Sequence, residues 1–170
     1  MTEPREIIIE KVTLNIGAGK STDKLEKGVK LLEMITGAKP VKTITNKRIA
    51  GWGLRPGLPI GCKVTIRKQK AEEVLKRLLG ARDMKLNPRQ FDNEGNIAFG
   101  IAEYTDIPGI DYTPDIGVLG LQVCATLQRQ GFRIKRRRMR KSKIGKKHKI
   151  TQQDAMDFFK KKFNVILEEE

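Results

Sequence analysis

The chain has 170 residues, with 35 Lys and Arg against 20 Asp and Glu, a formal net charge of +15. This length suits one domain, residues 1–170, and the positive charge favours a polyanionic partner. We expect a soluble, cytoplasmic protein without membrane partner, metal or cofactor, because no apolar run reaches roughly 18 residues, the opening MTEPREIIIE is unlike a signal peptide, and Cys62, Cys124 and His148 are too scattered for a zinc site.

The first predicted strand covers about residues 11–16, where apolar and polar residues alternate. It runs into the stretch LNIGAGKST at 14–22, which suggests the phosphate-binding loop of a nucleotide-binding enzyme. That loop requires a glycine five positions before its Gly-Lys pair, and this position is Leu14. Nucleotide hydrolysis is therefore disfavoured. We expect instead that the glycine turn, Lys20 and the following helix N-terminus present N–H groups to an RNA phosphate.

Helices are predicted over residues 23–37, 71–80 and 151–163 from apolar residues at helical spacing. Asp23 with Glu26 resembles an N-terminal cap of the first helix, and Thr151 with Asp154 a capping box of the third. Four further strands are predicted at about 41–46, 63–67, 96–101 and 119–125. The sum is an α+β fold: one mostly antiparallel sheet of about five strands, with helices on one face and a polar opposite face.

The polar side of the two most regular strands is cationic and rich in hydroxyl groups. It carries Lys11, Thr13, Asn15, Lys63, Thr65 and Arg67. No aromatic residue is available there to stack on a base, as sheets that read single-stranded RNA require. We interpret this side as a surface for the phosphates and 2′-hydroxyls of a folded RNA, recognised mainly by shape. An ordinary solvent face is the alternative.

The most basic part of the chain, residues 128–150, contains twelve Lys or Arg and no acid, with Arg136, Arg137 and Arg138 in its centre. Because like charges repel, we expect this insertion to be poorly ordered without counter-charge. We interpret it as a clamp on a nucleic-acid backbone, where cations displace condensed counterions. A solvated loop or a sorting signal is the alternative.

Several stretches resemble one protein family. The run RIAGWGLRPGLPIGCKVTIR at 48–67 resembles the signature of the universal large-subunit ribosomal protein family that binds 5S rRNA, the fifth in the large-subunit numbering. LNIGAG at 14–19, ITGAKPV at 35–41, FDNEGNIAFGI at 91–101 and IPGIDY at 107–112 support the resemblance. The basic insertion is similar to that of the archaeal and eukaryotic type, and the helical N-terminal extension of bacterial members is not seen.

The resemblance implies a structural, non-enzymatic protein that holds 5S rRNA in the central protuberance of the large subunit, next to other large-subunit rRNA. The expected rRNA-binding positions are Asn15, Gly17, Gly19, Lys20, Thr43, Thr45, Asn46, Lys47, Arg48, Lys63, Thr65 and Arg67. Arg136, Arg137 and Arg138 are added on the grounds of charge. A free nucleic-acid chaperone remains as an alternative that explains the charge alone.

The resemblance also implies two contacts outside rRNA. The loop at 50–59 is expected to reach P-site tRNA through Gly51, Trp52, Gly53, Leu54 and Arg55. Trp52 could stack on an exposed base or ribose, unless it is a core residue. The loop at 105–115 is expected to contact a small-subunit head protein through Asp106, Asp111, Tyr112 and Asp115, whose acids suit a basic protein partner.

Overall fold

The computed structural model describes residues 5–168. The elements in chain order are β1 (Ile7–Gly17), α1 (Thr22–Thr36), β2 (Val41–Ile44), β3 (Pro59–Ile66), α2 (Lys68–Gly80), β4 (Lys85–Leu86), β5 (Ile97–Ile101), β6 (Leu121–Arg129), α3 (Gln152–Phe163) and β7 (Ile166–Leu167). Five strands form an antiparallel sheet in the order β2-β3-β1-β6-β5. The predicted α+β fold with a five-stranded sheet is confirmed.

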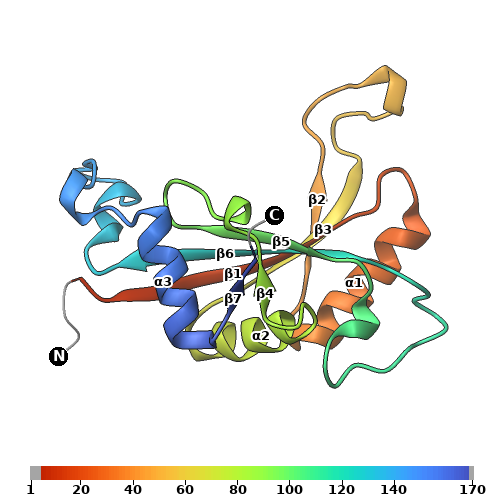
Figure 1. Cartoon of the computed structure of the whole chain (residues 1–170). Coiled ribbons are helices and arrows are strands. Elements are labelled where there is room, and N and C mark those ends of the chain that lie inside the picture. The colour runs from red at the N-terminus through yellow and green to blue at the C-terminus, as the bar shows by residue number, and fades with distance from the viewer. Residues whose placement is uncertain (1–4, 169–170) are drawn as a thin grey trace.

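One side of this sheet and all three helices share a single buried cluster. Val12, Leu14 and Ile16 of β1 belong to it, as do Leu75 of α2 and Phe159 of α3, all at most 3% exposed. Figure 1 shows α1 and α2 lying beneath the sheet, so the opposite face is left free of helices. Within residues 5–168, no helix is both long and apolar enough to cross a membrane.

A glycine allows α1 to approach the sheet closely. Gly28 is buried, and a Cβ atom at this position would lie 3.0 Å from Cys62 Sγ and 3.3 Å from Ile16 Cγ2. A glycine inside a helix costs about 1 kcal/mol relative to alanine. The close contact between helix and sheet explains why alanine, the better helix former, does not fit here.

The ends of the helices follow capping rules, with one correction. The N-cap of α1 is Ser21, whose Oγ accepts a hydrogen bond from the Lys24 N–H at 3.3 Å, so the predicted cap at Asp23 is wrong. Serine is among the preferred N-cap residues and here comes two positions earlier. The capping box of α3 is confirmed, with Thr151 and Asp154 each accepting from the other's amide at 3.2 and 3.1 Å.

Two strands were not predicted because each has only two residues, too few to show alternation. β4 and β7 pair in parallel and fix the chain after α3. A further irregularity affects the main sheet. The register of β1 against β6 shifts between Ile9 and Lys11, which makes Glu10 the extra residue of a β-bulge. Bulges redirect side chains, and Glu10 becomes important below.

Candidate nucleic-acid interface

The helix-free face of the sheet brings the predicted polar residues together. Thr13 lies opposite Thr65 and Asn15 opposite Lys63 in the β1–β3 ladder. Lys63, Thr65 and Arg67 are exposed, whereas Lys11, Thr13 and Asn15 are half-buried. Phe99 is the one aromatic residue in the five described strands of the sheet, and it is buried on the other side. The face therefore offers cations, amides and hydroxyls but no stacking platform.

The other half of this face was missed by sequence reasoning. β6 pairs with β1 so that Gln122 lies opposite Asn15, Cys124 opposite Thr13 and Thr126 opposite Lys11. The alternation in β6 was recognised, but only its apolar side was used. Reading its polar side would have extended the surface across a third strand.

The glycine turn differs from the expectation. The amides of Ala18 and Gly19 both donate to the Ile60 carbonyl, at 2.9 and 3.0 Å, and the Ser21 amide donates to the Ala18 carbonyl. These N–H groups are occupied within the protein, so the predicted anion-binding turn is wrong for residues 18–21 apart from Lys20. The turn instead connects β1 to β3 and delivers the Lys20 side chain.

Lys20 lies against the long β2–β3 connection. A Cβ atom at Gly53 would overlap the ammonium end of Lys20, and the backbone of Gly53 is left-handed with φ 59°. Gly17, Gly19 and Lys20 on one side and Gly53 on the other therefore belong to one surface. Two sites that were predicted separately, for rRNA and for tRNA, meet at this point.

The β2–β3 arm (residues 45–58) projects away from the body of the protein (Figure 1). Its stem is closed by hydrogen bonds between Thr45 and Leu58 and its tip by reciprocal bonds between Ile49 and Leu54. Trp52 is 67% exposed, so the alternative that it is a core residue is excluded. Asn46, Lys47, Arg48, Gly51 and Arg55 are exposed as well, and Thr43 of β2 is half-buried.

Two predicted contact residues of the arm have internal roles. Thr45 is 8% exposed, and its hydroxyl group donates to the Lys47 carbonyl at 3.0 Å and accepts from the Lys47 amide. Leu54 is also 8% exposed. Both side chains shape the arm and are not available to a ligand, because burial and internal hydrogen bonds already occupy them.

The basic segment (residues 128–150) has counter-charges that lie outside it. Lys135 pairs with Glu94 at 3.0 Å, Arg129 with Asp154 at 3.0 Å, and Arg136 with Glu10. Phe132 and Ile150 insert into the core with 9% and 2% exposure. Sequence reasoning counted only the charges inside the segment, and so missed the acids that the folded body supplies.

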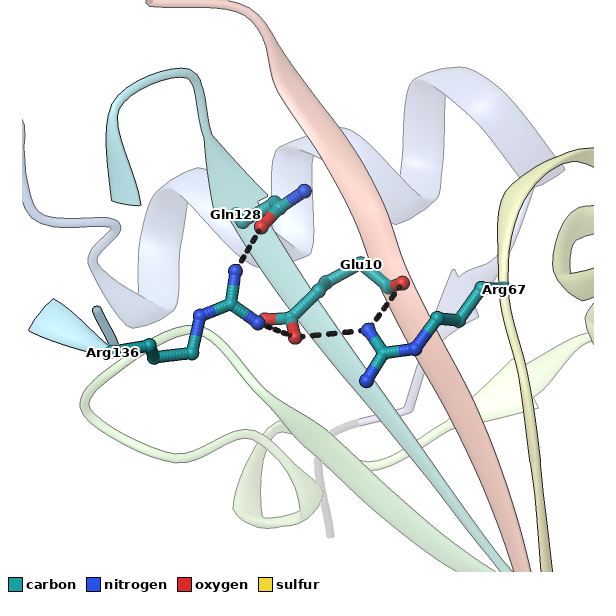
Figure 2. A network of polar contacts seen from close by, with 4 residues as sticks. All are labelled: Glu10, Arg67, Gln128 and Arg136. Atoms are coloured by element: carbon teal, nitrogen blue, oxygen red, sulfur yellow. Dashed lines mark hydrogen bonds and ion pairs between the residues drawn. The ribbon is translucent and has the colours of Figure 1, made fainter. Parts of the chain in front are cut away.

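A cavity of about 810 Å³ separates the basic segment from the end of the sheet. Its lining combines an apolar floor, including Leu127 and Ile144, with six lysines and one arginine: Lys11, Lys135, Lys141, Lys143, Lys146, Lys149 and Arg136. Glu10 and Glu94 are the acids in this wall. Figure 2 shows Glu10 between two guanidinium groups, those of Arg67 and Arg136.

The acidic loop at 105–115 lies on a different part of the surface. Tyr104 is fully buried, and its phenolic oxygen accepts a hydrogen bond from the Thr113 amide at 2.9 Å. The loop is thereby fixed, and its predicted contact residues are exposed: Asp106, Asp111, Tyr112 and Asp115. Tyr104 was missed because nothing in the sequence distinguishes a buried anchor from an exposed tyrosine.

Comparison with known proteins adds a family relationship to this geometry. The family described as ribosomal protein L5 matches residues 3–55, and the ribosomal L5 family C-terminus matches residues 59–158. The chain is 46% identical over 166 residues to large ribosomal subunit protein uL5 of Sulfurisphaera tokodaii, covering 97% of this chain and 94% of that protein. It is 47% identical over 163 residues to uL5 of Nitrosopumilus maritimus, covering 96% and 94%, and 46% identical over 162 residues to uL5 of Nanoarchaeum equitans, covering 95% of each.

Proposed function

The chain belongs to the ribosomal protein L5 family, and from this membership we propose that it binds 5S rRNA in the large ribosomal subunit through the polar face of its sheet. The family is structural, and the chain is not an enzyme. The position that would have to be the first glycine of a nucleotide-binding loop is Leu14, which is fully buried in β1. The resemblance inferred from sequence is confirmed.

The observation that carries the 5S proposal is the composition of the helix-free face. It is a broad, regular surface of cations, amides and hydroxyls, with no exposed ring among its described strand residues. Such a surface suits the phosphates and 2′-hydroxyls of a folded RNA rather than splayed single-stranded bases. The proposed contacts are Asn15, Lys20, Thr43, Asn46, Lys47, Arg48, Lys63, Thr65 and Arg67, with Gly17 and Gly19 allowing close approach. Arg136, Arg137 and Arg138 extend this set, whereas Thr45 is left out because it is buried.

Two further contacts of the same protein are proposed. The exposed indole of Trp52, with Gly51, Gly53 and Arg55 beside it, suits the ribose and phosphate surface of P-site tRNA, and the buried Leu54 supports that tip. The exposed acids of the loop at 105–115 suit a basic protein of the small-subunit head. These acids also argue against a free nucleic-acid chaperone, which would gain nothing from a fixed negative loop.

A matched pair of charge reversals tests the 5S proposal. Lys63→Glu changes the polar face, and Lys76→Glu makes the same change on the exposed side of α2. Filter binding with 5S rRNA should show an affinity loss of about tenfold or more for Lys63→Glu and of about twofold for Lys76→Glu. Equal losses would mean that only net charge matters. Equal affinity of the wild-type protein for 5S rRNA and for an unrelated folded RNA would favour the chaperone.

A second variant separates the arm from the sheet. Trp52→Ala should leave 5S rRNA affinity within about twofold, because the indole extends away from the sheet and single exposed contacts contribute little. Ribosomes that carry this variant should release P-site tRNA faster, as measured by filter-bound peptidyl-tRNA analogue over time. A large loss of 5S affinity would show that the arm has been assigned to the wrong partner.

A further inference from the structure

One carboxylate organises two arginines that come from distant parts of the chain. Glu10 Oε1 accepts a hydrogen bond from Arg67 Nη1 at 3.2 Å and another from Arg136 Nη1. Arg67 follows β3, whereas Arg136 belongs to the basic segment (Figure 2). The second nitrogen of Arg136, Nη2, donates to Gln128 Oε1 at 3.0 Å. Two guanidinium groups are thus held on a single oxygen atom.

Burial and exposure divide this cluster into a support and two working groups. The Glu10 side chain is only 9% exposed, whereas those of Arg67 and Arg136 are 53% and 44% exposed. A guanidinium group has five N–H donors. Among the described residues Arg67 uses one nitrogen and Arg136 two, so both retain donors toward solvent. The carboxylate is covered while the arginines remain available.

The charge of the cluster fits one phosphodiester. Two arginines and one carboxylate leave a net charge of +1, and a backbone phosphate carries −1. Arginine binds phosphate through paired N–H donors in a planar fork. Because side-chain ordering opposes binding, a carboxylate that already holds both forks lowers the entropic cost of engaging them.

We propose that Arg67 and Arg136 form a two-arginine clamp for one RNA backbone phosphate, and that Glu10 is the positioning residue that sets their geometry. This rests on the proposed function, in that the polyanion is ribosomal RNA. The clamp lies where the polar face meets the cavity beside the basic segment, whose wall Glu10 and Arg136 share. The strand on either side of the bound phosphate therefore meets the lysines of that wall.

An ordinary salt bridge would behave differently, and the sign of one substitution distinguishes the two. In a protein of net charge +15, neutralising an acid strengthens binding to RNA if only net charge matters. If Glu10 positions the clamp, neutralising it weakens binding. Glu94 is the matched control: it lines the same cavity, pairs with Lys135 and is 58% exposed.

The test compares Glu10→Gln and Glu94→Gln with the wild-type protein, on 5S rRNA and separately on large-subunit rRNA without 5S rRNA. Glu10→Gln should lose about three- to tenfold in affinity, and the salt slope of log K should become shallower by about 0.7–0.9, the value of one phosphate contact. Glu94→Gln should bind as well as the wild type or slightly better. Glu10→Gln binding as tightly as Glu94→Gln would overturn the clamp.

A second pair covers the case in which Glu10→Gln does not fold. Arg136→Lys keeps the charge but removes the planar fork, and Arg138→Lys makes the same change at an exposed neighbour. A loss of about threefold or more confined to Arg136→Lys supports the clamp, and equal behaviour of the pair contradicts it. If the wild-type protein shows no preference for 5S rRNA, the proposed function fails. The same comparisons on large-subunit rRNA then still decide the clamp.

Discussion

The β2–β3 arm and the basic segment project from opposite ends of the same sheet, and they are built by different means (Figure 1). The arm has three cations, Lys47, Arg48 and Arg55, and is held by backbone hydrogen bonds and left-handed glycines. The basic segment has twelve cations and is held by two buried side chains and by acids of the body.

This difference indicates a division of labour. Charge supplies affinity that is independent of sequence and sensitive to salt, whereas a rigid uncharged shape selects a partner without adding much affinity. We therefore expect the basic segment to determine how tightly the protein holds RNA. The arm should determine which additional surface it can touch.

The largest effect is expected from removing exposed charge at one end. Replacing Arg137, Arg138, Arg140, Lys141 and Lys143 by glutamine leaves Phe132 and Ile150 in the core, which deletion of the whole segment would not. If each contacts a phosphate, the salt slope for rRNA binding should fall by about 4. Replacing all three arm cations should change it by less than half as much. Equal slopes for the two variants would abolish the comparison.

An intermediate effect is expected on stability, because only one of the two regions is anchored in the core. Phe132→Ala should lower the free energy of unfolding by about 2–4 kcal/mol. Leu54→Ala should lower it by less than about 1 kcal/mol, because Leu54 is buried in the arm but lies outside the core cluster. Urea denaturation followed by circular dichroism measures both. A larger loss for Leu54→Ala would mean that the arm belongs to the cooperative unit.

The smallest effect concerns the ion pair at the base of the basic segment. Burial opposes ionisation of Asp154, but hydrogen bonds from Thr151 and the Arg129 guanidinium outweigh it and hold the pKa of this carboxyl below its ordinary value of 3.8. A lowered pKa stabilises the fold at neutral pH, and this contribution disappears as pH falls through the folded-state pKa.

Asp154→Asn should therefore cost about 0.5–1 kcal/mol at neutral pH, a modest figure because the carboxylate is 39% exposed. The difference from the wild type should shrink as pH drops below 3.8. Thermal unfolding across acidic pH measures this, with Asp157→Asn, exposed on the same helix, as the control. A difference that persists at low pH would show that the carboxylate charge is not its source.

The fold and the polar face could be predicted because they depend on local patterns. Alternation along β1 and β3 determined which side chains face away from the helices, and the capping box of α3 marked its first residue. The failures depended on contacts between distant residues. The Ile60 carbonyl occupies the amides of the glycine turn, and Glu10, Glu94 and Asp154 neutralise part of a segment that contains no acid.

Tethered cleavage of RNA tests the central claim most directly, that the helix-free face grips folded 5S rRNA. An iron chelate attached to a cysteine at Thr65, on that face, is compared with one attached at Glu73, exposed on α2, both with Cys124→Ser. Hydroxyl radicals released at position 65 should cleave a discrete set of 5S rRNA riboses, and those released at position 73 should leave the RNA intact. Cleavage that is equal from both positions, or confined to position 73, would contradict the account.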